Sequence, residues 1–85
     1  LKHIIVIDFQ GMYYKINFAT NDYVTIESKT LIEEVRIYDI YGKNVLQKNC
    51  HSNKELVNLY MLSSGAYFLQ LLTNNQTQSV KIIKR

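Results

Sequence analysis

The residues able to do chemistry are few in this chain, and their spacing does not suit a shared site. The only histidines are His3 and His51, and the only cysteine is Cys50. A zinc site needs three or four His, Cys or carboxylate ligands at characteristic spacings, and neither histidine belongs to such a cluster. The sequence therefore predicts no metal ion, and nothing in it indicates a cofactor.

Cys50 and His51 are adjacent, which invites comparison with a nucleophile and its general base. Neighbouring side chains on a strand point to opposite faces of the sheet, so these two would not meet. No carboxylate is placed to orient the histidine, because Asp22 and Asp39 lie in contexts typical of turns. We interpret Cys50 as a half-buried small side chain and predict that the chain is not an enzyme.

Binding sites for nucleic acid or sugar have little support in the composition. The net charge is only +3, and the basic residues form no stripe with interleaved aromatics, so nucleic-acid binding is not expected. Five tyrosines suit a carbohydrate platform, although strand tyrosines more often serve packing. They are Tyr13, Tyr14, Tyr38, Tyr41 and Tyr60. Asn75-Gln76-Thr77 matches the N-glycosylation pattern, but such three-residue matches are common by chance.

The composition is that of a small domain made of strands. The chain has 85 residues, enough for one domain with a modest core. Ile, Val, Thr, Tyr and Phe together number 31, whereas alanine occurs only at Ala19 and Ala66. There is no proline, so the turns must use Gly, Asn, Asp or Ser. No apolar run reaches the roughly 18 residues of a membrane span, so membrane insertion is not expected.

Alternation of apolar and polar residues predicts an antiparallel hairpin at the start of the chain. A two-residue turn at Gln10-Gly11 would pair Ile7 with Tyr14 and Ile5 with Ile16. The apolar faces of the two strands then match in register.

A second hairpin is predicted in the stretch IYDIYGKNVLQ. Asp39 can accept hydrogen bonds from backbone N–H groups two residues on, which initiates a turn. Gly42 supplies the positive φ that closes a three-residue loop with a bulge. Ile37 then faces Val45.

A third hairpin closes the chain around a type I′ corner at Asn74-Asn75. This turn pairs Leu69 with Val80 and Tyr67 with Ile82 on an apolar face. The wetter face pairs Phe68 with Lys81 and Gln70 with Ser79.

The stretch SNKELVNLYMLSSG, residues 52–65, is ambiguous. Ser52 and Glu55 form a capping box, and apolar residues follow at helical spacing, which favours a helix. The alternative is a short strand through Leu56–Leu59 and a turn at Ser63-Ser64-Gly65. The local signals do not separate the two.

The whole pattern predicts an all-β domain of seven to eight strands, counting Tyr23 to Glu27 and Glu33 to Ile40 as separate strands. An antiparallel β-sandwich with immunoglobulin-like topology is the leading architecture, and a small barrel is the alternative.

Three stretches, in order, resemble the C-terminal sorting domain of the type IX secretion system (type A, the Por system of Bacteroidota). They are VRIYDIYGKNV at 35–45, VNLYMLSSGAYFLQL at 57–71 and SVKIIKR at 79–85. Upstream, FATNDYVTIES at 18–28 resembles the strand that follows the family's Pro-Asn-Pro segment, which this chain lacks. Asn58 stands where the family usually has Asp. The family pattern favours the strand over the helix in the ambiguous stretch.

The resemblance implies one domain over residues 1–85, with 17–85 as the sorting domain. Residues 1–16 would be extra strands or the end of a preceding domain. Because the sequence begins with Leu1 rather than Met, we expect it to be cut from a longer protein, and an export signal could have been lost with the rest.

The implied function is a non-catalytic signal that sends a larger protein through the periplasm and the type IX outer-membrane translocon. A sortase-like peptidase is a further implied partner, and the cargo ends in the medium or on the cell surface. The expected recognition residues are Gly65, Tyr67, Lys81, Ile82, Ile83, Lys84 and Arg85. The expected structural turns use Asp39, Gly42, Asn74 and Asn75. We expect outward-pointing lysines on a free, basic last strand. The alternative is a carbohydrate- or protein-binding module on a secreted enzyme. The oligomeric state and the parent's activity are left open.

Overall fold

The regular structure consists of β-strands, as the composition predicts. The computed structural model describes residues 3–9, 12–18, 22–73 and 76–85. Their strands are β1 (His3–Phe9), β2 (Met12–Phe18), β3 (Tyr23–Tyr38), β4 (Asn44–Asn58), β5 (Gly65–Thr73) and β6 (Gln76–Lys84). Across these ranges no helix is long and apolar enough to cross a membrane.

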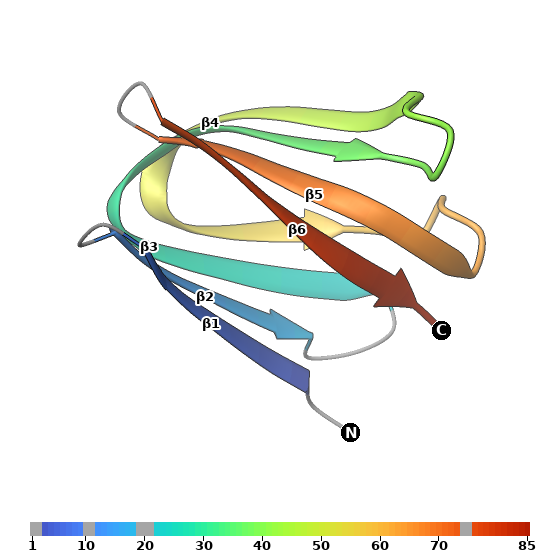
Figure 1. Ribbon diagram of the computed structural model, residues 1–85, viewed down its shortest axis with the longest axis horizontal. Coiled ribbons are helices and arrows are strands. Elements are labelled where there is room, and N and C mark those ends of the chain that lie inside the picture. Colours follow the sequence, from blue (N-terminus) through green and yellow to red (C-terminus); the bar gives the residue numbers. More distant parts are fainter. Residues whose placement is uncertain (1–2, 10–11, 19–21, 74–75) are drawn as a thin grey trace.

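The strands form one antiparallel sheet built around β3. The sheet runs in the order β1-β2-β3-β5-β6, and β4 pairs with the other edge of β3. Because β3 is 16 residues long, its first half pairs with β2 and its second half with β5, while β4 follows both halves. Figure 1 shows β3 and β4 bending together, so that the sheet curls back on itself.

The bend in β3 carries a change in the side-chain alternation. Val24 and Ile26 are buried at even positions, whereas Val35 and Ile37 are buried at odd positions. In an unbroken strand these two pairs would point to opposite faces of the sheet. The pairing of β3 with β4 shifts register on both sides of Ile32, which is the mark of a bulge. The irregularity keeps one face of β3 inward through the bend.

The core fills the space that the curled sheet encloses. Its buried apolar residues come from β2, β3, β5 and β6, from the end of β4 and from the residue that follows it. They are Ile16, Val24, Ile26, Ile32, Val35, Ile37, Val57, Leu59, Tyr67, Leu69, Leu71 and Ile82. Leucine, isoleucine and valine make up all but one of these positions. Burying each such side chain contributes about 1.5–3 kcal/mol relative to exposure, so this face specifies the fold.

The described part of the chain has six strands rather than the seven to eight expected. The sequence indicated two short strands, Tyr23 to Glu27 and Glu33 to Ile40, where the structure has the single strand β3. The intervening residues contain no glycine or proline, and the bulge lets them remain in the sheet. β4 is likewise one long strand that follows β3 through the bend.

Two of the predicted hairpin registers are confirmed. Ile7 pairs with Tyr14 and Ile5 with Ile16 in the β1–β2 hairpin. In the β5–β6 hairpin the described pairs include Leu69 with Val80, Tyr67 with Ile82, Phe68 with Lys81 and Gln70 with Ser79. The expected corner residues Asn74 and Asn75 lie outside the described residues.

The ambiguous stretch, residues 52–65, forms a strand and then a turn, as the family pattern favours, because β4 continues to Asn58 and its apolar residues are needed along β3. One local prediction is wrong. In the middle hairpin, Ile37 faces Leu46 rather than Val45. The register shifts between Ile37 and Tyr38, which moves the partner by one residue.

The first hairpin is part of the same sheet, and this leads to a stability prediction. β2 pairs with β3 from Val24 to Ser28, and Ile16 is fully buried in the core. Deleting residues 1–16 should expose this edge of β3 and remove Ile16. We expect the free energy of unfolding to fall by at least about 2 kcal/mol, and the melting temperature by about 10 °C or more. Thermal unfolding monitored by circular dichroism measures both chains, and equal melting temperatures would contradict the prediction.

Candidate functional site: the end of the last strand and the turns around it

β6 presents two different faces at its end. Ile82 and Lys84 point inward and are buried, whereas Lys81, Ile83 and Arg85 are exposed. The expectation that Lys84 points outward is therefore wrong. Side chains two residues apart share a face, so Lys84 follows Ile82 to the interior. The basic end of the strand has one inward cation and two outward ones.

The inward cation is bound by the backbone of a neighbouring turn. Lys84 is 8% exposed. Its Nζ donates hydrogen bonds to the carbonyl oxygens of Leu59 at 2.7 Å, Tyr60 at 3.3 Å and Leu62 at 2.5 Å. The Asp22 Oδ1 atom lies 3.7 Å from the same nitrogen. An ammonium group has three N–H donors, so the three carbonyls match its full hydrogen-bonding capacity.

The turn that binds Lys84 follows β4 and has its own internal hydrogen bonds. The backbone N–H of Leu62 donates to the carbonyl of Leu59 at 2.9 Å. The Leu59 N–H donates to the carbonyl of Asp22 at 2.6 Å, which joins the turn to the start of β3. Tyr60 N–H donates to the side-chain Oδ1 of Asn58 at 2.8 Å. We refer to residues 59–62 as the carbonyl turn, because its carbonyl oxygens face Lys84.

Asn58 fills the role expected of a turn-forming Asp. In the turn between β3 and β4, Asp39 Oδ1 accepts hydrogen bonds from the N–H groups of Tyr41 and Lys43, both at 2.9 Å. Asn58 makes the corresponding bond to Tyr60, two residues on. An Asn side chain has the same carbonyl acceptor, so the departure from the family pattern leaves the turn geometry in place.

Two glycines provide backbone conformations that other residues rarely adopt. Gly42 has φ of 84°, and its N–H donates to the Asp39 carbonyl at 3.1 Å. Gly65 has φ of 151° at the start of β5. A Cβ atom at either position would meet no neighbouring atom within 4 Å, so any cost of substitution comes from the backbone conformation.

Tyr67 fixes the segment between the carbonyl turn and β5. Its ring is buried, and its hydroxyl donates to the carbonyl oxygen of Ser63 at 2.7 Å. A buried phenol needs a partner for its hydroxyl, and Ser63 supplies one from four residues back in the chain. Tyr67 and Lys84 thus hold successive parts of the same connection, residues 59–64.

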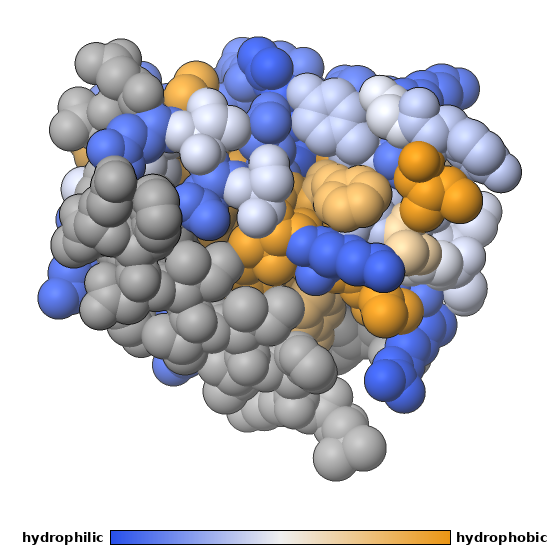
Figure 2. All heavy atoms as spheres, in the orientation of Figure 1, coloured by the Kyte–Doolittle hydropathy of each residue, from blue (hydrophilic) through white to orange (hydrophobic). Residues whose placement is uncertain are grey.

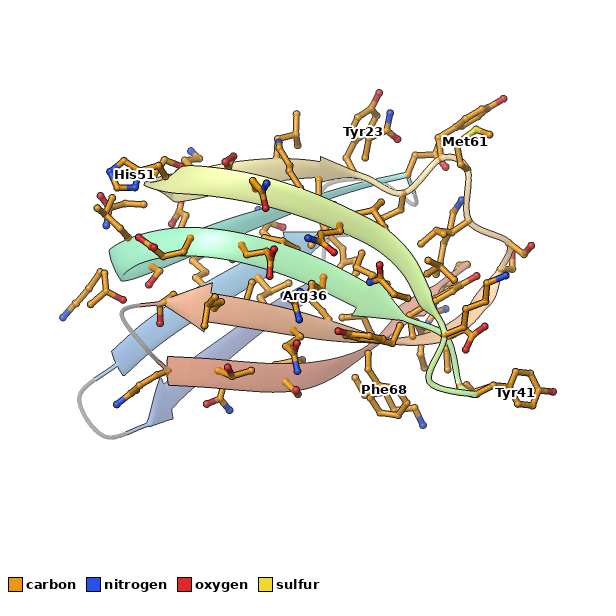
Figure 3. The ribbon with its side chains drawn as sticks, turned by 90° about the horizontal axis from the view of Figure 1, so that it is seen from above. Tyr23, Arg36, Tyr41, His51, Met61 and Phe68 are labelled. Carbon is orange, nitrogen blue, oxygen red and sulfur yellow. The ribbon has the colours of Figure 1, made fainter. Side chains whose placement is uncertain are left out.

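Cys50 is not activated as a nucleophile. Burial, and next the hydrogen bond with Glu55, raise the pKa of the thiol to about 11. The Sγ atom lies 3.5 Å from the carbonyl oxygen of Lys48. His51 is exposed, with Nδ1 3.7 Å from Glu33 Oε1, and Figure 3 shows it at the opposite end of the sheet from Tyr41. Within the residues that the structure describes, no three His, Cys, Asp or Glu side chains are grouped to hold a metal ion.

The tyrosines weighed as a sugar platform lie on separate segments. Tyr38 is at the end of β3, Tyr41 is at the tip of the following turn, and Tyr60 is in the carbonyl turn. Figure 3 places Tyr41 well away from Met61, the neighbour of Tyr60 in the chain. The side chains of Tyr13 and Tyr14 lie outside what the structure describes. The described tyrosines form no single flat surface.

These features define a small antiparallel β-domain whose last strand is fixed at its end by a buried lysine. Residues 19–85 match the family described as secretion system C-terminal sorting domain, and the chain belongs to this family of type IX secretion signals. A domain of this family marks its parent protein for export, to the medium or the cell surface. No curated protein and no solved structure gives a significant match.

Sequence reasoning found the last strand but missed the partner of Lys84. The pairing of Tyr67 with Ile82 already placed Ile82 on the apolar face, and the same alternation places Lys84 there. The Asp22 carboxylate and the carbonyl turn had no such signal. They approach Lys84 only because the start of β3 and the end of β4 pair with each other, Tyr23 opposite Asn58.

Replacing Lys84 with Met should destabilise the domain, because three carbonyl oxygens would lose a charged donor. We expect a loss of about 2–4 kcal/mol in the free energy of unfolding, measured by urea denaturation. Lys81→Met is a matched control, since it makes the same change on the same strand at an exposed position, and it should alter stability by less than about 0.5 kcal/mol. Equal effects of the two substitutions would refute the inward role of Lys84.

The raised pKa of Cys50 gives a prediction on its reactivity. A thiol with a pKa of about 11 carries roughly 100-fold less thiolate at neutral pH than one at the ordinary value of 9.0. Alkylation by iodoacetamide should therefore be slow in the folded chain at pH 7.5. The rate should rise with pH up to about 11, because the folded state disfavours the charged form. The urea-unfolded chain is the control, and mass spectrometry measures the rates. A folded chain that reacts at neutral pH as fast as the unfolded one would contradict this.

Proposed function

We propose that this domain directs a larger exported protein through the outer-membrane translocon of the type IX secretion system, and that it catalyses no reaction. The observation that carries the proposal is the family match over residues 19–85, which includes the turns and contacts described for the candidate site. The buried position of Lys84 adds a physical reason why the last strand is needed. It joins β6 to the carbonyl turn and to the start of β3.

The residues expected at the recognition site divide into two roles in this proposal. Lys81, Ile83 and Arg85 are exposed and are the ones that contact the machinery. Ile82, Lys84, Tyr67 and Gly65 hold the strand and the adjoining turn in place. Support for this division comes from burial alone: the first group lies on the outer face, and Ile82, Lys84 and Tyr67 are each less than 10% exposed. The turns at Asp39 and Gly42 serve the fold.

β6 is suited to recognition through its backbone. Among the described strands it pairs only with β5, so its other edge is available. An edge strand can extend a partner's sheet by main-chain hydrogen bonds, while alternate side chains provide specificity. The outward cations, Lys81 and Arg85, discourage unwanted pairing between edges until a suitable partner is present. A sortase-like peptidase would act on the cargo after passage through the periplasm and across the outer membrane.

We infer further that the curled sheet is a form of the immunoglobulin-like sandwich in which β3 and β4 pass through both layers. The bulge in β3 and the paired bend of β4 support this view. We also propose that residues 1–85 form one domain, because β2 pairs with β3 and places Ile16 in the core. No observation favours a carbohydrate- or protein-binding module.

An export assay tests the proposed function. Residues 1–85 are fused to the C-terminus of a periplasmic reporter in a host that has a type IX system. We expect the reporter outside the outer membrane, and in the periplasm when the domain is left out or the host lacks the translocon. Export that continues without the translocon would refute the proposal, as would retention of the complete fusion.

Deletion of Lys81 to Arg85 tests the last strand in the same fusion, and it should abolish export. The deletion also removes the buried Ile82 and Lys84, so it cannot separate recognition from folding. Lys84→Met and Lys81→Met make that separation, because only the first should lower stability. Unchanged export after the five-residue deletion would mean that this strand is not the signal.

A further inference from the structure

The outer face of β5 and β6 carries apolar side chains in register with cations. Tyr38, Phe68 and Lys81 lie opposite one another across β3, β5 and β6. The next pair on the same face of β5 and β6 is Ala66 with Ile83. Residues directly opposite each other in antiparallel strands share a face, so these side chains form two adjacent rows. We refer to Phe68 and Ile83, with the exposed Lys81 and Arg85, as the outer face.

The apolar members of the outer face are exposed to solvent. Phe68 is 41% exposed and Ile83 is 58% exposed. Figure 2 shows apolar side chains gathered over the start of β5 and the end of β6, with a hydrophilic side chain lying across them. Figure 3 shows Phe68 projecting away from the sheet, on the same side as the turn that carries Tyr41. A cluster of this kind on a sheet surface is typical of a binding site.

The two cations of the outer face are not neutralised by an ion pair. Lys81 and Arg85 are exposed and form no ion pair in the part of the chain that the structure describes. The nearby carboxylates are already engaged. Asp39 accepts two backbone N–H groups, and Glu34 binds Arg36 and Gln47. The outer face is therefore complementary to a ligand that is both apolar and anionic.

The position of this face at a sheet edge indicates a polypeptide ligand. The unpaired backbone groups of β6 can be satisfied by the backbone of an added strand. In such a strand alternate side chains would lie beside Lys81, Ile83 and Arg85 on the outer face. Sugar rings stack on flat aromatic surfaces, whereas Ile83 is aliphatic and branched. A protein segment pairs with the backbone edge and packs on Ile83, whereas a polysaccharide has no peptide backbone to pair with that edge.

We propose that the outer face and the free edge of β6 bind an extended acidic segment of a protein partner. Side chains on one face of a strand are two residues apart, so every second residue of the segment meets the outer face. In the order carboxylate, aliphatic, carboxylate, these residues lie next to Lys81, Ile83 and Arg85. The added strand extends the sheet beyond β6. This inference rests on the proposed function only in assigning the partner to the export machinery.

A peptide titration tests the binding chemistry without reference to export. The probe is a capped peptide of sequence Ser-Glu-Thr-Val-Thr-Glu-Ser, which places both Glu and the Val on one face of a strand, and the control replaces each Glu with Lys. We expect the acidic peptide to shift the backbone NMR signals of residues 79–85 and to bind at least about tenfold more tightly than the control. Binding should weaken as salt is raised. Equal binding of the two peptides, or shifts confined to other strands, would overturn the proposal. Tighter binding of polygalacturonate than of the acidic peptide would also overturn it.

Paired variants locate the site and connect it to export. Lys81→Glu and Ile83→Ser should each reduce binding of the acidic peptide at least about tenfold. Lys54→Glu is the control, because Lys54 lies on β4, opposite the first half of β3, and should leave binding unchanged. The same variants are placed in the reporter fusion, with melting temperatures measured for each. We expect reduced export for the two outer-face variants at unchanged stability. If both outer-face variants are exported at the level of the unaltered fusion, the inference is overturned and the sorting function stands. If the unaltered fusion is not exported, the sorting function alone is overturned.

Discussion

The bulged bend of β3 is the constraint on which the rest of the structure depends. It reverses the alternation of buried residues between Ile26 and Val35, so that both halves of one strand keep their apolar sides inward. Without this reversal, one half would turn its isoleucine and valine residues to solvent. With it, one strand provides a central pairing partner for β2 in its first half and for β5 in its second half. The enclosed core, and the place of β6 beside β5, follow from that arrangement.

Lys84 joins the end of β6 to the carbonyl turn and to the start of β3. The carbonyl turn follows β4, and Asp22 precedes β3, so both reach the lysine because β3 and β4 pair along their whole length. A buried ammonium group is costly unless its donors are satisfied, and here the carbonyl oxygens of the turn satisfy them. The charge is therefore tied to one geometry of the turn. This is a different use of a terminal cation from that of Lys81, which remains in solvent.

The sequence allowed the local pairings to be predicted more accurately than the way they assemble. Alternation and turn chemistry were sufficient for the β1–β2 and β5–β6 registers, since each hairpin is fixed by contacts within about 20 residues. The continuity of β3 was missed because the stretch SKTLIEE contains no regular alternation, and a bulge leaves the same trace as a loop. Local signals left residues 52–65 open between a helix and a strand, and the family pattern favoured the strand. The capping box at Ser52 and Glu55 was a valid local signal, but pairing with β3 outweighed it.

The candidate site shows the same contrast between local features, which the sequence indicates, and contacts between distant segments, which it does not. The family motifs marked Gly65, Tyr67 and the last strand. We expected Lys84 to point outward, although its alternation with Ile82 places it inward. The carbonyl turn could not be recognised, because backbone carbonyl groups are present in every residue and have no signature in the sequence. The outer face was only partly visible. Phe68 opposite Lys81 could be read from the hairpin, whereas its position next to Tyr38 depends on the contact between β3 and β5, distant in sequence.

The passage of β3 and β4 through both parts of the sheet also bears on how the domain comes apart. Neither part has a complete set of strands of its own, so separating them requires breaking the same two strands in both. We therefore expect loss of structure to be all-or-none, with no half-folded species accumulating. For a sorting domain, such cooperativity means that the export signal is either completely present or completely absent.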